Sequence, residues 1–328
     1  MGSSRWDPTD YMDRQTTRSA TGQSAFAYSQ AVSSGQVARA VHEKMNPFGV
    51  MREARDSVDH PETVPVAVFF DVTGSMGSIP VALQKKLGQL METLVGNGYL
   101  AHPAILFGAI GDAYRDVAPL QVGQFESGIE LDDDLSRIWL EGGGGGNGGE
   151  SYAMAAYFTA TQTSTDAWEK RGKKGYLFTM GDEPVHDLTA KELSAFLGAN
   201  VECGMTAKEA YELASQRYEV FHIVLGKGSS NSHVMSQWKG ILGERAIYLD
   251  DYEAVTETIA STIGLLEGAV NLGSLETSLV VAGADQRAAA SASRAVTILG
   301  TGTSAVTKAT ADGSLGVFGS VSGGITKL

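Results

Sequence analysis

Between residues 64 and 271, short apolar runs alternate with longer amphipathic stretches. The runs have the length of buried strands and stay apolar throughout, which is typical of parallel strands covered on both faces. The expected strands are VPVAVFFD (64–71), PAILFGAIG (103–111), SRIWLEG (136–142), KGYLFTMGD (174–182), YEVFHIVLG (218–226) and RAIYLDD (245–251). This alternation predicts an α/β fold with a doubly wound, mostly parallel sheet and helices on both faces.

The stretches between these runs predict helices. In the first of them, Pro80 suits a first helical turn, and Leu83, Leu87, Leu90 and Leu94 fall on one face. The expected helices are 80–98, 150–172, 189–199, 206–217, 230–242 and 253–270. Each lies beside an expected strand, as the doubly wound arrangement requires.

The two ends of the chain differ from this central part. Residues 1–46 are polar and read as an N-terminal arm, which leaves residues 47–271 as the domain, with its core at 64–271. Residues 272–328 form an extension rich in Gly, Ala, Ser and Thr. We expect either a flexible tail or a strand-rich extension that docks on a neighbour, with strands at SLVV (278–281), AVTIL (295–299) and GVFGSV (316–321).

Composition narrows the possible functions. Hydrophobic residues make up 43% of the chain and charged residues 19%, which is a globular composition. A net charge of −13 argues against nucleic-acid binding, which needs a basic footprint. A single cysteine, Cys203, excludes an intrachain disulfide and a cysteine-based zinc site. With no signal peptide and no apolar run long enough for a membrane span, we expect a soluble cytoplasmic protein without a membrane partner. Secretion by a route that needs no signal peptide is the alternative.

Candidate chemistry begins where the strand at 64–71 ends. Asp71, Thr73 and Ser75 are spaced two residues apart, so a loop can turn all three side chains toward one centre. One carboxylate and two hydroxyls form a half-shell of the oxygen ligands that Mg²⁺ prefers. The alternative is a structural Asx-turn whose hydroxyls cap the next helix.

Other loops at the same edge of the sheet offer more oxygens, because ligands of such sheets bind at the carboxyl ends of the strands. The glycine-rich loop LEGGGGGNGGESYAMA (140–155) supplies Asn147, Glu150 and Ser151. The stretch YLFTMGDEPVHD (176–187) supplies Asp182 and Glu183. A further loop, GAIGDAYRD (108–116), carries Asp112 and Asp116.

Taken together, these motifs resemble the von Willebrand factor A domain and its metal-ion-dependent adhesion site. That family has Asp-x-Ser-x-Ser after its first strand, a Thr or Asp from a glycine-rich loop, and an Asp after its fourth strand. Asp71, Thr73 and Ser75 match the first element, with Thr in place of the first Ser. The motif sequences DVTGSMG, GGGGGNGGES and GDEP resemble those of phage and bacterial members of the superfamily.

The later elements match less closely. Asp182 corresponds to the family's late Asp, although the order Gly-Asp-Glu differs from the usual Asp-Gly and leaves Glu183 as an alternative. Asn147 or Glu150 stands where the family usually has Thr. The resemblance covers residues 64–271 and implies Mg²⁺ or Mn²⁺ at the top of the sheet, with an open position that the Asp or Glu carboxylate of a protein partner completes.

Enzymatic alternatives find weaker support. The glycine run lacks the Gly-Lys-Ser/Thr ending of a phosphate-binding loop. Ser75 does not lie in a Gly-x-Ser-x-Gly elbow. A hydrolase that uses the metal to activate water would have Glu183 as its only reasonable base. His186, His222 and His233 are scattered and read as structural, and DDDLSR (132–137) reads as a solvated helix start.

We therefore expect a non-enzymatic, metal-dependent protein-interaction module, with Asp71, Thr73, Ser75 and Asp182 holding the ion and Asn147 or Glu150 assisting. Relatives in bacteria suggest an adaptor role beside an AAA-type ATPase. The alternative is a structural component of a phage or bacterial assembly. That component would be virion-associated if the source is a phage, would use the N-terminal arm and C-terminal tail, and would have a stabilising or vestigial metal site.

Overall fold

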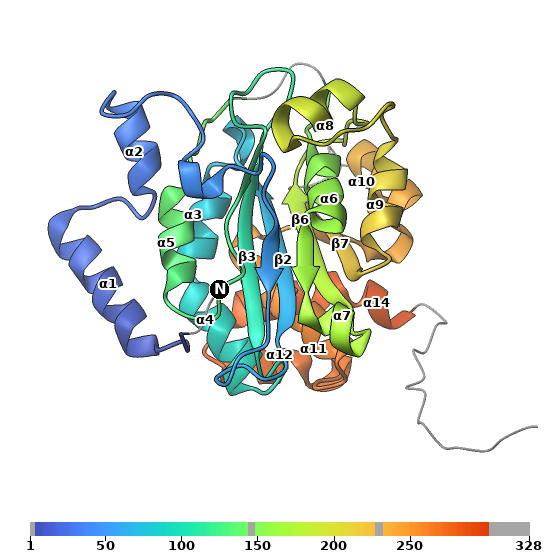
Figure 1. Cartoon of the computed structure of the whole chain (residues 1–328). Coiled ribbons are helices and arrows are strands. Elements are labelled where there is room, and N and C mark those ends of the chain that lie inside the picture. The colour runs from blue at the N-terminus through green and yellow to red at the C-terminus, as the bar shows by residue number, and fades with distance from the viewer. Residues whose placement is uncertain (1–3, 144–147, 227–231, 302–328) are drawn as a thin grey trace, which may run out of the picture.

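The computed structural model describes residues 4–143, 148–226 and 232–301. Its main sheet has the strand order β4-β3-β2-β6-β7-β8, in which β4 is antiparallel and the other strands are parallel (Figure 1). The strands are β2 (Val64–Asp71), β3 (Pro103–Ile110), β4 (Leu120–Val122), β6 (Gly175–Gly181), β7 (Tyr218–Leu225) and β8 (Ala246–Leu249). The expected α/β class and mostly parallel sheet are confirmed.

Helices cover both faces of this sheet, and β2 shows why the strands are apolar along their whole length. Val66 and Phe70 belong to the core on one face, whereas Ala67 and Phe69 belong to the core on the other. Burial on both sides explains the continuous apolar pattern that a one-sided strand would lack.

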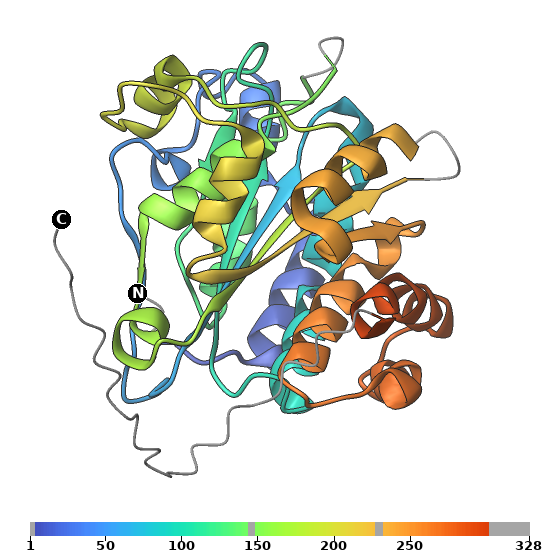
Figure 2. The same ribbon diagram turned by 90° about the vertical axis from the view of Figure 1, so that its right-hand side faces the viewer.

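The first face carries α3 (Ser78–Lys85), α4 (Leu87–Met91), α5 (Glu130–Arg137) and α11 (Val255–Leu266). The second carries α6 (Tyr152–Thr161), α8 (Ala190–Leu197), α9 (Ala207–Ala214) and α10 (Ser232–Leu242) (Figure 2). Two short strands, β1 (Arg52–Ala54) and β5 (Thr163–Thr165), form a separate parallel pair. The helix α7 (Asp166–Arg171) directly follows β5. No helix in the described ranges is long and apolar enough to cross a membrane.

The strand expected at 136–142 is wrong. Its first residues end α5, and the edge strand is instead β4, which is only three residues long. Trp139 makes its backbone hydrogen bonds with a side chain: it donates to Gln121 Oε1 at 2.8 Å, and its carbonyl accepts from Gln121 Nε2 at 2.8 Å. A buried apolar run can thus satisfy its backbone without joining a ladder.

The described part of the C-terminal extension is helical, so the strands expected at 278–281 and 295–299 are also wrong. The residues form α12 (Leu272–Val281), α13 (Gln286–Val296) and α14 (Ile298–Thr301). Leu275 and Leu279 are fully buried, and small alanines let α13 pack closely beside them and α11. Asp285 caps α13 by accepting from two backbone amides. The stretch expected as a strand at 316–321 lies outside the described residues.

The N-terminal arm packs on the body. It contains α1 (Pro8–Thr21), α2 (Ala27–Ser33) and the 3-10 turn η1 (Glu43–Met45), and it buries Tyr11 and Phe26 in the first core. The expected solvated start of α5 is wrong for Asp132, whose carboxylate is buried and accepts from Arg18 Nη1 and Nη2 at 2.7 and 2.6 Å. Charge pairing between α1 and α5 therefore fixes the arm.

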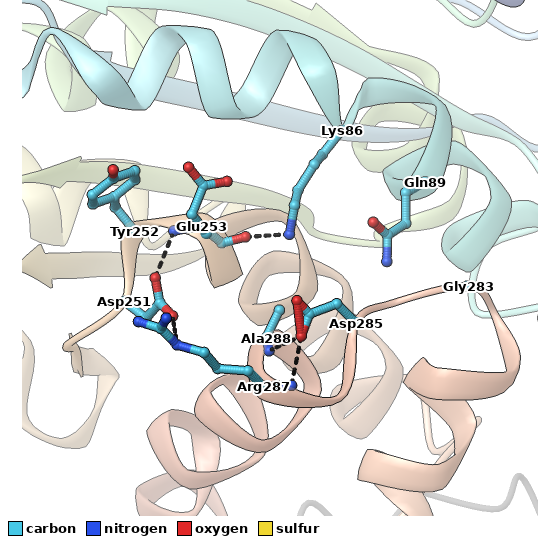
Figure 3. A pocket seen from close by; sticks show the side chains of 9 residues that line it. All are labelled: Lys86, Gln89, Asp251, Tyr252, Glu253, Gly283, Asp285, Arg287 and Ala288. Atoms are coloured by element: carbon cyan, nitrogen blue, oxygen red, sulfur yellow. Dashed lines mark hydrogen bonds and ion pairs between the residues drawn. The ribbon is translucent and has the colours of Figure 1, made fainter.

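A polar cavity of about 370 Å³ lies between the end of α3, the turn η6 (Tyr252–Ala254) and the start of α13 (Figure 3). Lys86 pairs with Glu257 at 2.7 Å, and Arg287 pairs with Asp251 at 2.9 Å. The cations of the cavity are thus engaged by carboxylates of the chain. None of the site residues expected from the sequence lines it.

Candidate functional site

The register of the sheet brings the loops after β2, β3 and β6 to one edge. Asp71, the last residue of β2, pairs with Ile110 near the end of β3, and Phe70 pairs with Met180 near the end of β6. The chain after β2 then contacts the glycine-rich loop, because Gly74 donates to the Gly143 carbonyl at 3.1 Å and Gly142 donates to the Val72 carbonyl at 3.3 Å. The loops expected to share a site therefore meet.

Asp71 is the centre of this edge, and its side chain is only 1% exposed. Its Oδ1 accepts from the Thr73 backbone amide at 2.7 Å and from Thr73 Oγ1 at 2.5 Å. Its Oδ2 accepts from the Tyr152 hydroxyl at 2.6 Å. Within the described residues, these donors are all neutral. Burial raises the pKa of Asp71 to about 6, although the hydrogen bonds from Thr73 and Tyr152 oppose the rise.

These hydrogen bonds also orient the hydroxyl groups. Because a carboxylate only accepts, Thr73 and Tyr152 must each turn their proton toward Asp71. The remaining lone pairs of Thr73 Oγ1 then point elsewhere, which is the arrangement that a metal ligand needs. The Asx-turn alternative is present as well, since Asp71 accepts from the amide two residues on. The turn and the ligand role are compatible, because the turn holds the carboxylate and the hydroxyl together.

Asp182 and Glu183 follow β6 and are half-buried. The charge of Asp182 contributes to the raised pKa of Asp71, which places the two carboxylates within electrostatic reach of each other. Burial, and then the charge of Asp182, raise the pKa of Glu183. The charge of Asp182 therefore acts on both Asp71 and Glu183.

Glu150 and Ser151 are the residues of the glycine-rich loop that directly precede α6, and both are buried. Glu150 donates its amide to the Pro184 carbonyl at 2.9 Å, so its backbone is tied to the loop after β6. Ser151 Oγ accepts from the amide of Ala113 at 3.0 Å, so this hydroxyl serves the loop after β3 rather than Asp71. The Glu150 charge acts electrostatically on Tyr152.

Two of the expected ligands cannot be placed. Asn147 lies outside the described residues, and the side chain of Ser75 does too, although its backbone lies in the 3-10 turn η2 (Gly74–Met76). Asp112 and Asp116 are buried and shape their own loop: Asp112 Oδ1 accepts from the amide of Tyr114 at 2.9 Å, and Asp116 Oδ2 accepts from the amide of Asp112 at 2.8 Å.

The sequence reasoning missed Tyr152 and Gly181. Tyr152 is fully buried and reaches Asp71 from the first turn of α6. Gly181 leaves room for it, because a Cβ at that position would lie 1.9 Å from the tyrosine hydroxyl oxygen. The tyrosine of GGESY, directly after the glycine-rich loop, and the glycine of MGDEP were the available signals. The sequence does not show that the first residue of α6, Tyr152, turns its side chain toward Asp71 at the end of β2.

A layer of buried aromatic and polar groups lies beneath the centre. The rings of Tyr152 and His222 meet edge to face with their centroids 5.1 Å apart, and His222 stacks on Trp238 at 3.4 Å. His222 Nδ1 lies 2.8 Å from Thr179 Oγ1, which in turn lies 2.8 Å from the Tyr211 hydroxyl. Burial lowers the pKa of His222 well below its usual value, which favours the neutral imidazole.

The donor set suits a hard cation. No group of three or more His, Cys, Asp or Glu side chains within the described ranges is arranged to hold a metal ion, so a site here depends on hydroxyls and water as well as on carboxylates. Asp71 and Thr73 offer oxygens only, as Mg²⁺ or Mn²⁺ requires. A buried carboxylate with neutral donors and a second carboxylate nearby leaves local negative charge, which a divalent cation would neutralise.

No protein-family model matches this sequence, and no curated protein matches it. Among solved structures, the chain is similar to the pilus adhesin SpaC from Lactobacillus rhamnosus GG in its open conformation, with 11% identity and a TM-score of 0.43. It is also similar to proximal thread matrix protein 1 from the mussel byssus, with 10% identity and a TM-score of 0.41.

A second structure of the mussel protein has a zinc-occupied metal-ion-dependent adhesion site and gives a TM-score of 0.40 at 10% identity. These matches cover 65% of the present chain, but only 31% of the SpaC chain and 48% of the mussel protein. The similarity therefore spans about a third to a half of those chains. Identities of 10–11% and TM-scores below 0.5 assign no function to this chain.

Proposed function

We propose that this protein is a non-enzymatic binding module that recognises a protein partner through a divalent cation held at the carboxyl edge of its sheet. The carrying observation is Asp71, a carboxylate that is 1% exposed and whose hydrogen-bond donors within the described residues are all neutral. Burying a charge without an opposite charge is unfavourable. A bound cation would supply that opposite charge.

The cation would be Mg²⁺ or Mn²⁺. Asp71, Thr73 and Asp182 would hold it, together with Ser75 and with Asn147 or Glu150. A site with few direct carboxylates leaves the ion electrophilic, so an Asp or Glu side chain of the partner can complete its shell. Glu183 is the one reasonable base that the sequence suggests, and among the described residues no contact aims its carboxylate at Asp71. These features support binding rather than turnover.

The surroundings of the site support a protein partner. The loop between β3 and β4 exposes two large side chains, Tyr114 at 60% and Val117 at 52%. The same loop carries Asp112 and Asp116 at this edge of the sheet. Exposed aromatic and aliphatic groups beside a polar centre are typical of protein interfaces. The partner itself, whether an AAA-type ATPase or a component of an assembly, stays a prediction.

Thermal unfolding tests the cation directly. We expect Mg²⁺ or Mn²⁺ to stabilise the wild-type chain over an EDTA-treated sample, by about 2.7 kcal/mol when the ion is present at a hundred times its Kd. The Asp71→Asn variant keeps the size of the side chain and should lose this stabilisation. A wild-type unfolding temperature that ignores Mg²⁺, Mn²⁺ and EDTA would overturn the proposal.

The assembly hypothesis predicts a different result. The described parts of the arm and of the C-terminal extension bury Tyr11 and Leu275 in the core of their own chain, which favours the binding function. If residues 302–328 nevertheless link neighbours, removing them will lower the oligomeric state in sedimentation. An unchanged oligomeric state would exclude the tail as the assembly device.

A further inference from the structure

We propose that Tyr152 is a positioning residue of the cation site, which holds the Asp71 carboxylate in the orientation that presents its free lone pair and the Thr73 hydroxyl to the ion. This inference rests on the proposed function, because it assigns a role within that site. It adds a side chain from α6 that lies 81 positions from Asp71 in the chain. Tyr152 does not itself ligate the ion in this account.

The first step is the geometry at Asp71. Thr73 donates twice to Oδ1, whereas Tyr152 donates to Oδ2 at 2.6 Å. A carboxylate has about four lone-pair positions, so among the described residues these three donors leave about one, on Oδ2. The carboxylate is therefore gripped through both oxygens, and rotation about its terminal bond would break at least one contact. Without the tyrosine hydroxyl, the donors in the described part of the chain would hold the Oδ1 side alone.

The second step is the rigidity of the tyrosine. Its ring is fully buried and packs edge to face on His222 and on Trp238, with centroids 5.1 and 5.6 Å away. His222 is itself stacked on Trp238 and linked to Thr179 of β6. The phenol is thus anchored through His222 to β6, the strand that Asp182 directly follows.

The third step is the space that the chain keeps for the hydroxyl. At Gly181 a Cβ would lie 1.9 Å from the tyrosine oxygen and 2.6 Å from its Cζ. The residue before Asp182 must therefore be glycine for Tyr152 to reach Asp71. Groups that orient a metal ligand in this way commonly change metal affinity by ten- to a hundredfold when removed.

The chain offers a matched control. Tyr211 is as buried as Tyr152, and it packs edge to face on the same Trp238 with centroids 5.3 Å apart. Its hydroxyl meets the neutral Thr179 Oγ1 rather than a carboxylate. Tyr152→Phe and Tyr211→Phe therefore remove the same atom from the same aromatic layer, and only the first removes a contact with Asp71.

The experiment is calorimetric titration of the full chain with Mg²⁺ and with Mn²⁺ alone, alongside the unfolding free energy measured in EDTA. We expect Tyr152→Phe to weaken the affinity for the ion about tenfold or more. Tyr211→Phe should lower the unfolding free energy in EDTA by a similar amount to Tyr152→Phe and leave the Kd unchanged. A merely structural role for Tyr152 would move the unfolding free energy but not the Kd.

Gly181→Ala provides the second variant, since it keeps the phenol and displaces it. It should weaken ion binding as Tyr152→Phe does. Wild-type affinity in either variant, or equal weakening in Tyr211→Phe, would overturn the positioning role. If the wild-type chain binds neither ion, the proposed function itself fails, and that result is distinct from unchanged binding in the variants.

Discussion

Asp71 and Asp132 are both 1% exposed, yet the chain surrounds them with opposite kinds of partner. Asp132 accepts from both terminal nitrogens of Arg18, at 2.7 and 2.6 Å, and also from Arg14 and Gln84 at 3.3 and 3.2 Å. Asp71 accepts only from neutral donors among the described residues, and the charge of Asp182 acts against it.

The difference separates a structural charge from a functional one. A buried carboxylate needs compensation, and at Asp132 the protein supplies it from its own arginines, which fasten α1 to α5. At Asp71 the protein supplies orientation without opposite charge. A buried carboxylate without an opposite charge lowers the stability of the fold, so binding an external cation should stabilise this centre most.

The largest effect is expected at the Asp132 centre. Arg18→Leu removes the bidentate partner and leaves the buried Asp132 carboxylate with only the longer contacts to Arg14 and Gln84 among the described residues, which should lower the unfolding free energy by about 3 kcal/mol. Urea unfolding in EDTA measures this loss. The stabilisation by Mg²⁺ should remain as in the wild type, because α1 does not contribute to the cation site. A loss of the Mg²⁺ effect in this variant would break the distinction between the two centres.

A smaller, pH-dependent effect is expected at Asp71 in the absence of metal. Its pKa is raised to about 6 from an ordinary value of 3.8, so the native state binds the proton more tightly than the unfolded chain. The wild-type protein should therefore gain stability as the pH falls from about 6 to about 4, relative to Asp71→Asn. We expect a change of about 2 to 3 kcal/mol in the difference between the two proteins.

This difference isolates Asp71 from other titrating groups. Burial lowers the pKa of His222, so this histidine should destabilise the fold once the pH falls below the ordinary pKa of a histidine. Because His222 is present in both proteins, its effect cancels in the difference. Urea unfolding in EDTA at several pH values measures the difference. If the difference in unfolding free energy between the two proteins did not vary between pH 4 and 6, the pKa of Asp71 would not be raised in the folded protein.

The smallest effect is expected at Asp182. Its charge is a minor cause of the raised pKa of Asp71, so Asp182→Asn should raise the unfolding free energy in EDTA at neutral pH by less than about 1 kcal/mol. The same substitution should weaken Mg²⁺ binding, because it removes a carboxylate from the site. Unchanged affinity would place Asp182 outside the cation shell and restore Glu183 as the alternative.

Much of the fold could be predicted because it follows from local pattern. Strands buried on both faces are continuously apolar, so the expected strands at 64–71, 103–111, 174–182, 218–226 and 245–251 are confirmed. The run at 136–142 failed because the pairing partner of Trp139 is the side chain of Gln121. The strands expected at 278–281 and 295–299 failed because helix packing against α11 overrides the β preference of short valine-rich runs.

In the candidate site, too, local contacts could be predicted from the sequence and long-range contacts could not. Asp71 and Thr73 could be paired from their spacing, since their contact is local. The meeting of the loops followed from the rule for parallel sheets. Tyr152 could not be found, because its contact with Asp71 depends on the direction in which α6 leaves the glycine-rich loop and on the space beside Gly181. Long-range contacts of single side chains leave no periodic trace in a sequence.

The central claim is that Asp71 binds a divalent cation, whereas the charge of Asp132 is compensated by arginines of the chain itself. Calorimetric titration of the metal-free full chain with Mn²⁺ tests it most directly, in the wild type, Asp71→Asn and Arg18→Leu. The account predicts one ion per chain in the wild type and in folded Arg18→Leu, and none in Asp71→Asn. Absence of binding in the wild type, or equal binding in Asp71→Asn, would contradict it.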